Sequence, residues 1–139
     1  MEFFNQVHNP GLDIAHLKKI LTINNLADLC ASISVITPVN EIKGEIYCIW
    51  GAFYVKREEL RYGVRFSLLN CPHALAWTVT FDEAGQNIII HCTIDKIETD
   101  ADFVESIHEF VSDWSNGIAN ALQCASTADT HGKTAESSG

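Results

Sequence analysis

Two runs of alternating apolar residues stand on either side of a short polar segment, and they constrain the fold more than any other feature. The polar segment is "DEAGQN", residues 82–87, and every second residue is apolar from 75 to 81 and again from 88 to 94. This pattern predicts a β-hairpin. Requiring the two apolar faces to coincide fixes its register. The expected pairs are Phe81 with Ile88, Val79 with Ile90, and Trp77 with Cys92.

The hairpin separates side chains that would otherwise suggest a metal site. Cys71 and His73 precede its first strand, while His91 and Cys92 lie in its second. Neighbouring residues of a strand point to opposite faces, so His91 and Cys92 cannot share an ion. His73 is expected opposite about Lys96, more than ~15 Å from His91. Because a structural zinc ion needs four converging ligands, we predict no metal site. Only Cys71 with His73 keeps a metal- or thiol-responsive role open.

The rest of the sequence carries no motif for catalysis or for a cofactor. Cys71 and His73 lack a third group that would orient them as nucleophile and base. The glycines are isolated and form no phosphate-binding loop. We therefore predict a protein without enzymatic activity and without a cofactor.

Apolar residues at roughly helical spacing occupy residues 12–29. They predict one helix, or two short helices broken near Asn24 and Asn25, with Asp13 available near the first helical residue as a cap.

A second and longer helix is predicted from about Asp100 to Leu122, with Thr99 or Asp100 as its N-cap. One continuous apolar stripe runs along it, and acidic residues occupy its other side. The polar residues that follow, 124–139, lack periodicity and are expected to form a disordered tail. Residues 1–123 are then a single domain.

Three further strands are expected between the first helix and the hairpin. The first is "SISVIT", residues 32–37. The second is a long strand from Ile42 to Val55, interrupted at Gly51 by a bulge or bend. For residues 57–70 a two-residue alternation favours a strand over a helix. The predicted fold class is α+β: an antiparallel sheet of about five strands, in the order α-βββ-ββ-α, packed on one face by the N-terminal helix and the long C-terminal helix.

One layer of two helices covers only one face of such a sheet. Apolar residues on the other face would then form a partner-binding surface, unless loops and the N-terminal "MEFF" fold over it. Arginines near this face offer contacts for an acidic partner. The predicted partner-binding residues are Tyr47, Ile49, Phe53, Leu69, Ile89, Arg57, Arg61 and Arg65.

Charge and cysteine content restrict the partners and the compartment. Nine Lys and Arg face eighteen Asp and Glu, giving a net charge of −9, which disfavours nucleic acid and membrane surfaces as partners. The five cysteines follow no disulfide framework, and neither a secretory signal nor a membrane-length apolar run is visible. We expect a cytoplasmic protein with free thiols.

The C-terminal half, "LAWTVTFDEAGQNIIIHCTIDKIETDADFVESIHEFVSDWSNGIANAL", resembles the end of class I type III secretion chaperones. It has two strands around an acidic Gly turn, then a helix with Phe103, Phe110 and Trp114 in the pattern of that family. The YbjN-type regulators share this layout. The resemblance implies a non-catalytic homodimer that binds an extended or apolar segment of a client protein, by strand addition or in apolar pockets. The alternative is a small regulatory or sensory domain that responds to thiol chemistry or metal ions through Cys71 and His73.

Overall fold

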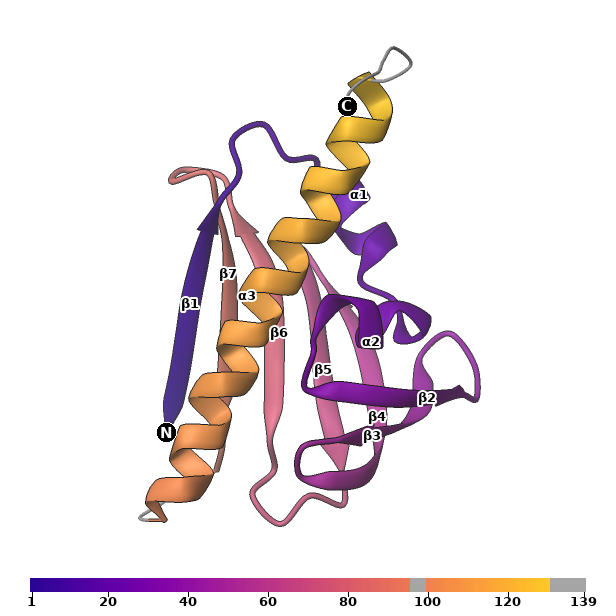
Figure 1. Ribbon diagram of the computed structural model, residues 1–139, viewed down its shortest axis with the longest axis vertical. Coiled ribbons are helices and arrows are strands. Elements are labelled where there is room, and N and C mark those ends of the chain that lie inside the picture. Colours follow the sequence, from indigo (N-terminus) through magenta and orange to yellow (C-terminus); the bar gives the residue numbers. More distant parts are fainter. Residues whose placement is uncertain (96–99, 131–139) are drawn as a thin grey trace.

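Among the residues that the structure describes, seven antiparallel strands form one sheet in the order β1-β7-β6-β5-β4-β3-β2. The computed structural model describes residues 1–95 and 100–130, with residues 35 and 123–130 described by their backbone alone. The strands are β1 (Glu2–His8), β2 (Ile33–Pro38), β3 (Lys43–Cys48), β4 (Gly51–Leu60), β5 (Gly63–Leu69), β6 (Ala76–Asp82) and β7 (Asn87–Thr93). Strands β2 to β7 are a meander, and β1 is added beside β7 (Figure 1).

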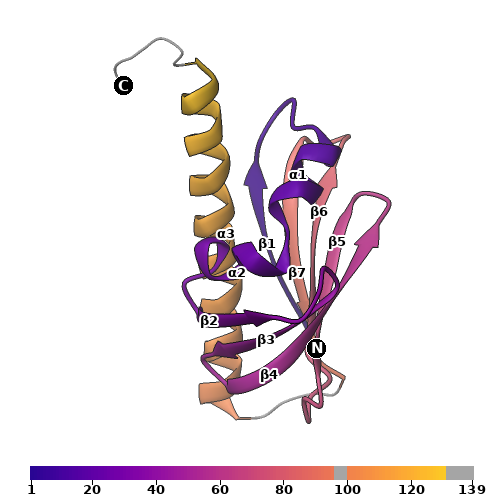
Figure 2. The same ribbon diagram turned by 90° about the vertical axis from the view of Figure 1, so that its right-hand side faces the viewer.

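The helices lie on one face of this sheet. They are α1 (Ile14–Ile20), the 3-10 turn η1 (Ile23–Asn25), α2 (Leu26–Leu29) and α3 (Ala101–Thr130). Figures 1 and 2 show α3 running close to the direction of β1 and β7, whereas β2 and β3 cross it. The sheet therefore curls around α3 as a half-barrel. The α+β class and the helical layer on one face agree with the prediction, but the number of strands does not.

The core fills the space between the sheet and α3. The predicted hairpin register is confirmed, because Phe81 pairs with Ile88, Val79 with Ile90 and Trp77 with Cys92. These side chains all point toward the helices, and each is almost completely buried. An aromatic cluster holds α3 against this face. Its members are Phe66, Trp77, Phe110 and Trp114.

Helix α3 begins as predicted and extends beyond its predicted end. The Asp100 carboxylate accepts hydrogen bonds from the backbone N–H groups of Asp102 at 3.0 Å and Phe103 at 3.4 Å, which caps the helix. The backbone stays helical to Thr130 rather than ending near Leu122. The helix therefore includes the first residues of the predicted tail, and residues 131–139 lie outside the described part of the chain.

The middle of α3 passes very close to α2. A Cβ atom added to Gly117 would lie 1.9 Å from the carbonyl oxygen of Leu29. Only a residue without a side chain allows this approach. The same segment is joined to the start of β2 by a hydrogen bond of 2.5 Å from the Ser32 hydroxyl to Asp113.

The N-terminal helical segment takes the broken form of the prediction. The helices α1 and α2 are both short, and η1 stands between them near the expected break. The Asp13 side chain accepts from the Ala15 N–H at 3.2 Å and caps α1, as expected.

The prediction of five strands is wrong at the N-terminus, where residues 2–8 form β1. Phe3 is buried opposite Cys92, and Val7 lies half-buried opposite Ile88. Asn5 stands between them on the same face, so the alternation of apolar residues is too short to be recognised. The alternative in which "MEFF" folds over the other face is also wrong, because β1 extends the sheet at its edge.

The single long strand predicted from Ile42 to Val55 is wrong as well, since it is a hairpin. Strand β3 ends at Cys48, the chain reverses through Ile49 and Trp50, and β4 starts at Gly51. The reversal uses Gly51 at φ +113°, which other residues rarely adopt. The two turn residues are apolar, so they concealed the reversal in the sequence.

Residues 57–70 are extended, which confirms the preference for strand over helix. They contain the end of β4, a turn at Arg61 and Tyr62, and the whole of β5. Gly63 opens β5 in close contact with β6, where an added Cβ would lie 2.0 Å from the Val79 carbonyl oxygen.

Candidate binding surface

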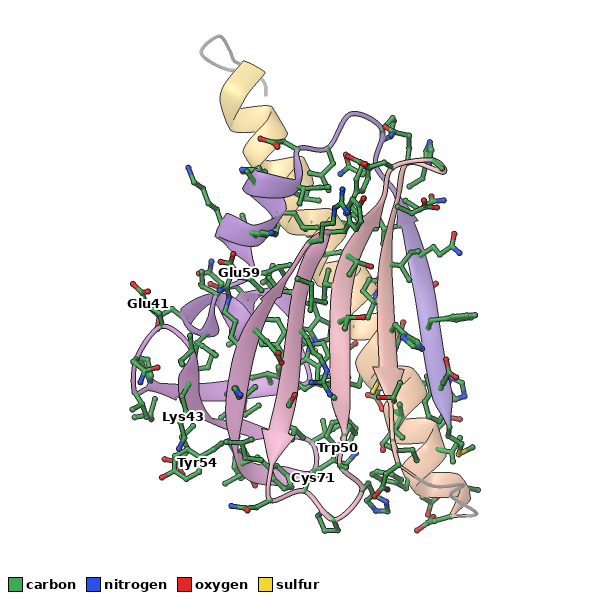
Figure 3. The ribbon with its side chains drawn as sticks, turned by 180° about the vertical axis from the view of Figure 1, so that it is seen from behind. Glu41, Lys43, Trp50, Tyr54, Glu59 and Cys71 are labelled. Carbon is green, nitrogen blue, oxygen red and sulfur yellow. The ribbon has the colours of Figure 1, made fainter. Side chains whose placement is uncertain are left out.

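The face of the sheet that points away from the helices, here called the outer face, carries exposed aromatic side chains. Strand register assigns to it Phe4 of β1, Tyr47 of β3 and Tyr54 of β4. These three side chains are 66%, 55% and 42% exposed. Figure 3 looks onto this face, and no helix of the described chain crosses it. Exposed apolar residues on one uncovered face are typical of a protein-binding surface.

Charged residues of β3 to β5 surround the two exposed tyrosines of the outer face, Tyr47 and Tyr54. The Lys43 ammonium group lies 4.9 Å from the centre of the Tyr54 ring, and Figure 3 shows the two side by side. Arg65 pairs with Glu58 at 3.4 Å across β4 and β5, where both side chains are exposed. Lys56 of β4 is also exposed on the outer face. Glu45 is exposed opposite Tyr54 as well, so three basic and two acidic side chains lie in this part of the outer face of an acidic protein.

Three of the predicted apolar binding residues lie on the outer face. They are Tyr47, Leu69 and Ile89, of which Leu69 and Ile89 are half-buried. Ile49 lies in the turn between β3 and β4 and is 45% exposed. Phe53 lies on the opposite face, because the turn reverses the chain and pairs Phe53 with Ile46 rather than continuing from Tyr47. Phe53 packs against the core, so its placement beside Tyr47 was wrong.

The three predicted arginines do not share one surface. Arg57 lies on the helical face, where its guanidinium donates to the carbonyl oxygens of Leu21 at 2.6 Å and Lys18 at 3.1 Å. It thereby caps the C-terminal end of α1. Its side chain is only 11% exposed, so it serves the fold. Arg61, in the β4–β5 turn, lies over the Tyr62 ring, and Arg65 alone belongs to the outer face.

A groove of about 600 Å³ lies between α1 and the start of β3. Lys18, Lys19, Glu41 and Glu59 line it together with Arg57. Glu59 already pairs with Arg57 at 3.2 Å. The mixed charges of the groove favour no single class of ligand.

Cys71 and His73 lie at a second and smaller hollow, of about 280 Å³, at the other end of the sheet. They belong to the loop between β5 and β6, and Trp50 and Phe103 line the same hollow. Figure 3 shows Trp50 near Cys71. The His73 ring stacks on Phe103 with 4.4 Å between the ring centres. Trp50 is fixed by a hydrogen bond of 2.8 Å to the Ser106 hydroxyl. The hollow is thus aromatic and holds one half-exposed thiol.

The other ligand candidates lie apart, as the hairpin register requires. His91 points to the outer face and contacts the Glu2 carboxylate at 2.8 Å, while Cys92 is buried opposite Trp77. Burial raises the pKa of the thiols of Cys92 and Cys30 to about 12 and also raises that of Cys48. Within residues 1–95 and 100–130, no group of three or more His, Cys, Asp and Glu side chains is placed to hold a metal ion.

Two of the exposed aromatic residues were absent from the predicted binding surface. Phe4 was missed because β1 was missed. Tyr54 was missed because one strand continuing from Ile42 to Val55 would place it on the face opposite Tyr47. A search for glycines able to adopt positive φ within long apolar runs would have found the reversal, and with it the position of Tyr54.

Comparison with models of protein families finds no match, and no curated protein matches. Among solved structures, the crystal structure of an uncharacterized protein from Bacillus thuringiensis is similar, with a TM-score of 0.61 and 12% sequence identity. The match covers 88% of this chain and 98% of the other. At this identity the similarity concerns the fold alone. In addition, none of the described helices is both long and apolar enough to span a membrane.

Proposed function

We propose that this protein is a cytoplasmic, non-catalytic binding protein of the secretion-chaperone type, a homodimer that holds an extended, apolar segment of a client protein. The observation that carries the proposal is the uncovered outer face with its exposed aromatic side chains, Phe4, Tyr47 and Tyr54. A sheet face that stays uncovered costs free energy by leaving apolar area in water, and a bound segment would remove that cost.

The charges near this surface favour one kind of client. Three basic residues outnumber the two acidic ones, Glu45 and Glu58, around the exposed tyrosines of β3 and β4, whereas the chain as a whole carries a net charge of −9. The basic residues are Lys43, Lys56 and Arg65. A segment that alternates apolar and acidic residues would match both features, since the acidic groups would be repelled elsewhere on the protein. The free thiols of the four described cysteines suit a reducing compartment.

Selection from a library of displayed peptides tests this proposal. Peptides selected on the wild-type protein should combine apolar and acidic residues. Fluorescence anisotropy should then show at least about tenfold weaker binding to a Tyr47→Ser/Tyr54→Ser variant, which corresponds to about 1.4 kcal/mol. A Glu105→Gln/Glu109→Gln variant, changed on the exposed side of α3, is the matched control and should bind like wild type. Equal binding to all three proteins would place the peptide site elsewhere, and failure to select any peptide would count against the proposal.

The alternative function, a regulatory or sensory domain, is supported by one observation. Cys71 is half-exposed in an aromatic hollow beside His73, whereas Cys30, Cys48 and Cys92 are buried. A thiol in this position is accessible to metal ions or thiol-reactive compounds. Metal analysis of the purified protein and the melting temperature with and without a thiol reagent test this role, with Cys71→Ser as control. Absence of bound metal together with no Cys71-dependent change in melting temperature would reject it.

A further inference from the structure

The two edges of the sheet differ in their capacity to pair with another strand. The edge strands are β1 and β2, and an edge strand presents backbone N–H and C=O groups on one side. Strand β2 is poorly suited to pairing. Its register with β3 shifts between Ile33 and Val35, and Pro38 has no N–H at a position that points away from β3. A bulge and a proline are common means of blocking an edge.

Strand β1 has neither obstacle. Its pairing with β7 is continuous from Glu2 to His8, and it contains no proline or glycine. Two hydrogen bonds at its ends fix which residues face β7. The Ile94 N–H donates to the Met1 carbonyl at 3.1 Å, and the Asn9 N–H donates to the Gln86 carbonyl at 2.9 Å.

Because hydrogen-bonded positions alternate in an antiparallel pair, the odd-numbered residues from 1 to 9 face β7. The backbone groups of the even-numbered residues point to the open edge. These are Glu2, Phe4, Gln6 and His8. No strand of the described chain pairs with them. The Gln6 N–H donates to the Asn5 side chain at 2.9 Å, a local bond that a partner strand would replace.

One symmetric register uses all of these outward groups. If two copies of β1 pair antiparallel about a two-fold axis at Asn5, Glu2 lies opposite the partner's His8 and Phe4 lies opposite the partner's Gln6. An axis at Phe4 or at Gln6 would leave one outward residue of each strand without a partner residue. The geometry of the edge therefore selects the axis at Asn5.

The side chains match in this register. Glu2, which contacts His91 of its own chain at 2.8 Å, faces the partner's His8 on the outer face, so polar side chains meet there. Phe3 faces the partner's Val7 on the helical face, so apolar residues meet there. The two Phe4 rings, each 66% exposed in one chain, become diagonal neighbours at about 7–8 Å, within reach of aromatic side chains.

The charge of the whole chain restricts the surfaces through which two copies can meet. Two copies that each carry a net charge of −9 repel one another. Glu2 is the only acidic residue within residues 1–12, and β2 carries none, so an approach through either edge brings few carboxylates together, and the bulge and proline of β2 decide in favour of β1. The exposed side of helix α3 carries several acidic residues and would be a poorer contact.

From these observations we propose that β1 of one protomer pairs with β1 of a second copy about a two-fold axis at Asn5. The two sheets then form one continuous sheet, and their outer faces become one binding surface. The inference rests on the homodimer of the proposed function and specifies how that dimer is built.

Cysteine cross-linking reads the register directly. Single cysteines are placed at Phe4, Asn5 or Gln6 in a Cys71→Ser/Cys124→Ser background, with glutathione disulfide as the oxidant that is reduced when two thiols join. At a non-hydrogen-bonded pair the Cα atoms are about 4.5 Å apart, within the range of a disulfide. Asn5→Cys should cross-link to a covalent dimer at least about tenfold faster than Phe4→Cys or Gln6→Cys, because its two copies sit at this spacing. Faster cross-linking at either neighbour overturns the axis at Asn5, and none at any position overturns the pairing of β1.

Proline substitution gives an independent measurement. Gln6→Pro removes an N–H that points outward and not toward β7, so circular dichroism should show an intact fold while light scattering shows that the dimer is lost. Gln6→Thr keeps the N–H and should remain dimeric. A Gln6→Pro variant that stays dimeric overturns the β1 interface but leaves the homodimer standing. A wild-type protein that is monomeric at micromolar concentrations overturns both, while peptide binding still tests the outer face by itself.

Discussion

The helical face and the outer face of the same sheet differ in what covers them, and the contrast is visible along a single strand. In β6, Trp77 and Val79 are 1% and 0% exposed beneath α3, whereas Thr78 and Thr80 are half-buried and polar. Toward β1 and toward β3 and β4, the outer face becomes aromatic and exposed. Burial on one face stabilises the fold, which leaves the other face free to vary with function. Substitutions on the two faces should therefore have separable effects.

The largest effect is expected from Trp114→Ala on the helical face. Trp114 is completely buried and contacts Phe66 and Trp77, so its removal should lower the free energy of unfolding by about 3–5 kcal/mol. The Trp114 indole N–H makes no hydrogen bond within the described chain, so Trp114→Phe should cost much less. Urea unfolding measures both. A loss of less than about 1 kcal/mol for Trp114→Ala would show that α3 does not hold this face.

The next effect separates two arginines that the sequence grouped together. Arg57→Ala removes the bonds from the guanidinium to the carbonyl oxygens of Leu21 and Lys18, and charged hydrogen bonds of this kind contribute about 1.5–3 kcal/mol. Arg65→Ala, on the outer face, removes only an exposed ion pair and should cost less than about 1 kcal/mol. Urea unfolding of the two variants side by side tests the difference. Equal losses would contradict the capping role of Arg57.

Gly117→Ala should destabilise the protein by about 1–3 kcal/mol, as overpacked sites do, although alanine ordinarily stabilises a helix relative to glycine. The reason is the added Cβ, which would lie 1.9 Å from the Leu29 carbonyl oxygen and force α2 away from α3. Asn116→Ala, one residue earlier and exposed, is the control and should leave the melting temperature unchanged or slightly raised. An unchanged melting temperature for Gly117→Ala would mean that α2 shifts without cost.

The buried thiols of the helical face predict a loss of stability at alkaline pH. Burial raises the pKa of Cys30 and Cys92 to about 12, above the ordinary value of about 8.5. The folded state therefore keeps protons that the unfolded chain releases, so stability is complete below about pH 8.5 and falls as the pH rises toward 12. Each thiol should raise the unfolding equilibrium constant by up to about tenfold per pH unit.

Urea unfolding between pH 8 and 10 measures this slope against an internal control. Cys92→Ala should reduce the slope by about one proton, because it leaves fewer buried thiols to titrate. An identical slope in the variant and in wild type would contradict the assignment of this effect to Cys92.

The smallest effect is expected on the outer face. Tyr47→Ser changes a side chain that is 55% exposed, so the free energy of unfolding should change by no more than about 0.5 kcal/mol. Peptide binding should nevertheless weaken. A large loss of stability would mean that Tyr47 supports the fold, and the contrast between the two faces would then be less sharp than their burial indicates.

Much of the fold could be predicted because regular periodicity reports burial on one face. The hairpin register, the long C-terminal helix and the broken N-terminal helix all followed from spacing, since their buried residues recur at regular intervals. The two strand errors have the opposite origin. In β1, Asn5 occupies an apolar position, and in the β3–β4 turn Ile49 and Trp50 are apolar where turns are usually polar. Trp50 is there because it packs against Phe110 and Phe103, contacts that lie far away in sequence.

The binding surface was predicted less well because it depends on strand parity. Because the reversal at Ile49 and Trp50 was not detected, Phe53 was assigned to the outer face in place of Tyr54. Tyr47 was assigned to the correct face because it precedes the turn. The role of Arg57 could not be foreseen either, because its partners are backbone carbonyl groups of α1. Every residue has a backbone carbonyl group, so the sequence does not indicate which of them accepts a hydrogen bond from a side chain.

The position of β1 also determines the order in which the chain can fold. Strand β1 precedes the other strands of this sheet in the chain but pairs only with β7, and the Met1 amino group donates to the Ile94 carbonyl across a separation of 93 residues. The meander from β2 to β7 forms from neighbouring segments, whereas β1 must wait until β7 has been synthesised. During that interval the apolar residues of β1 stay exposed, so this sheet is completed by a strand that is synthesised before the rest of it.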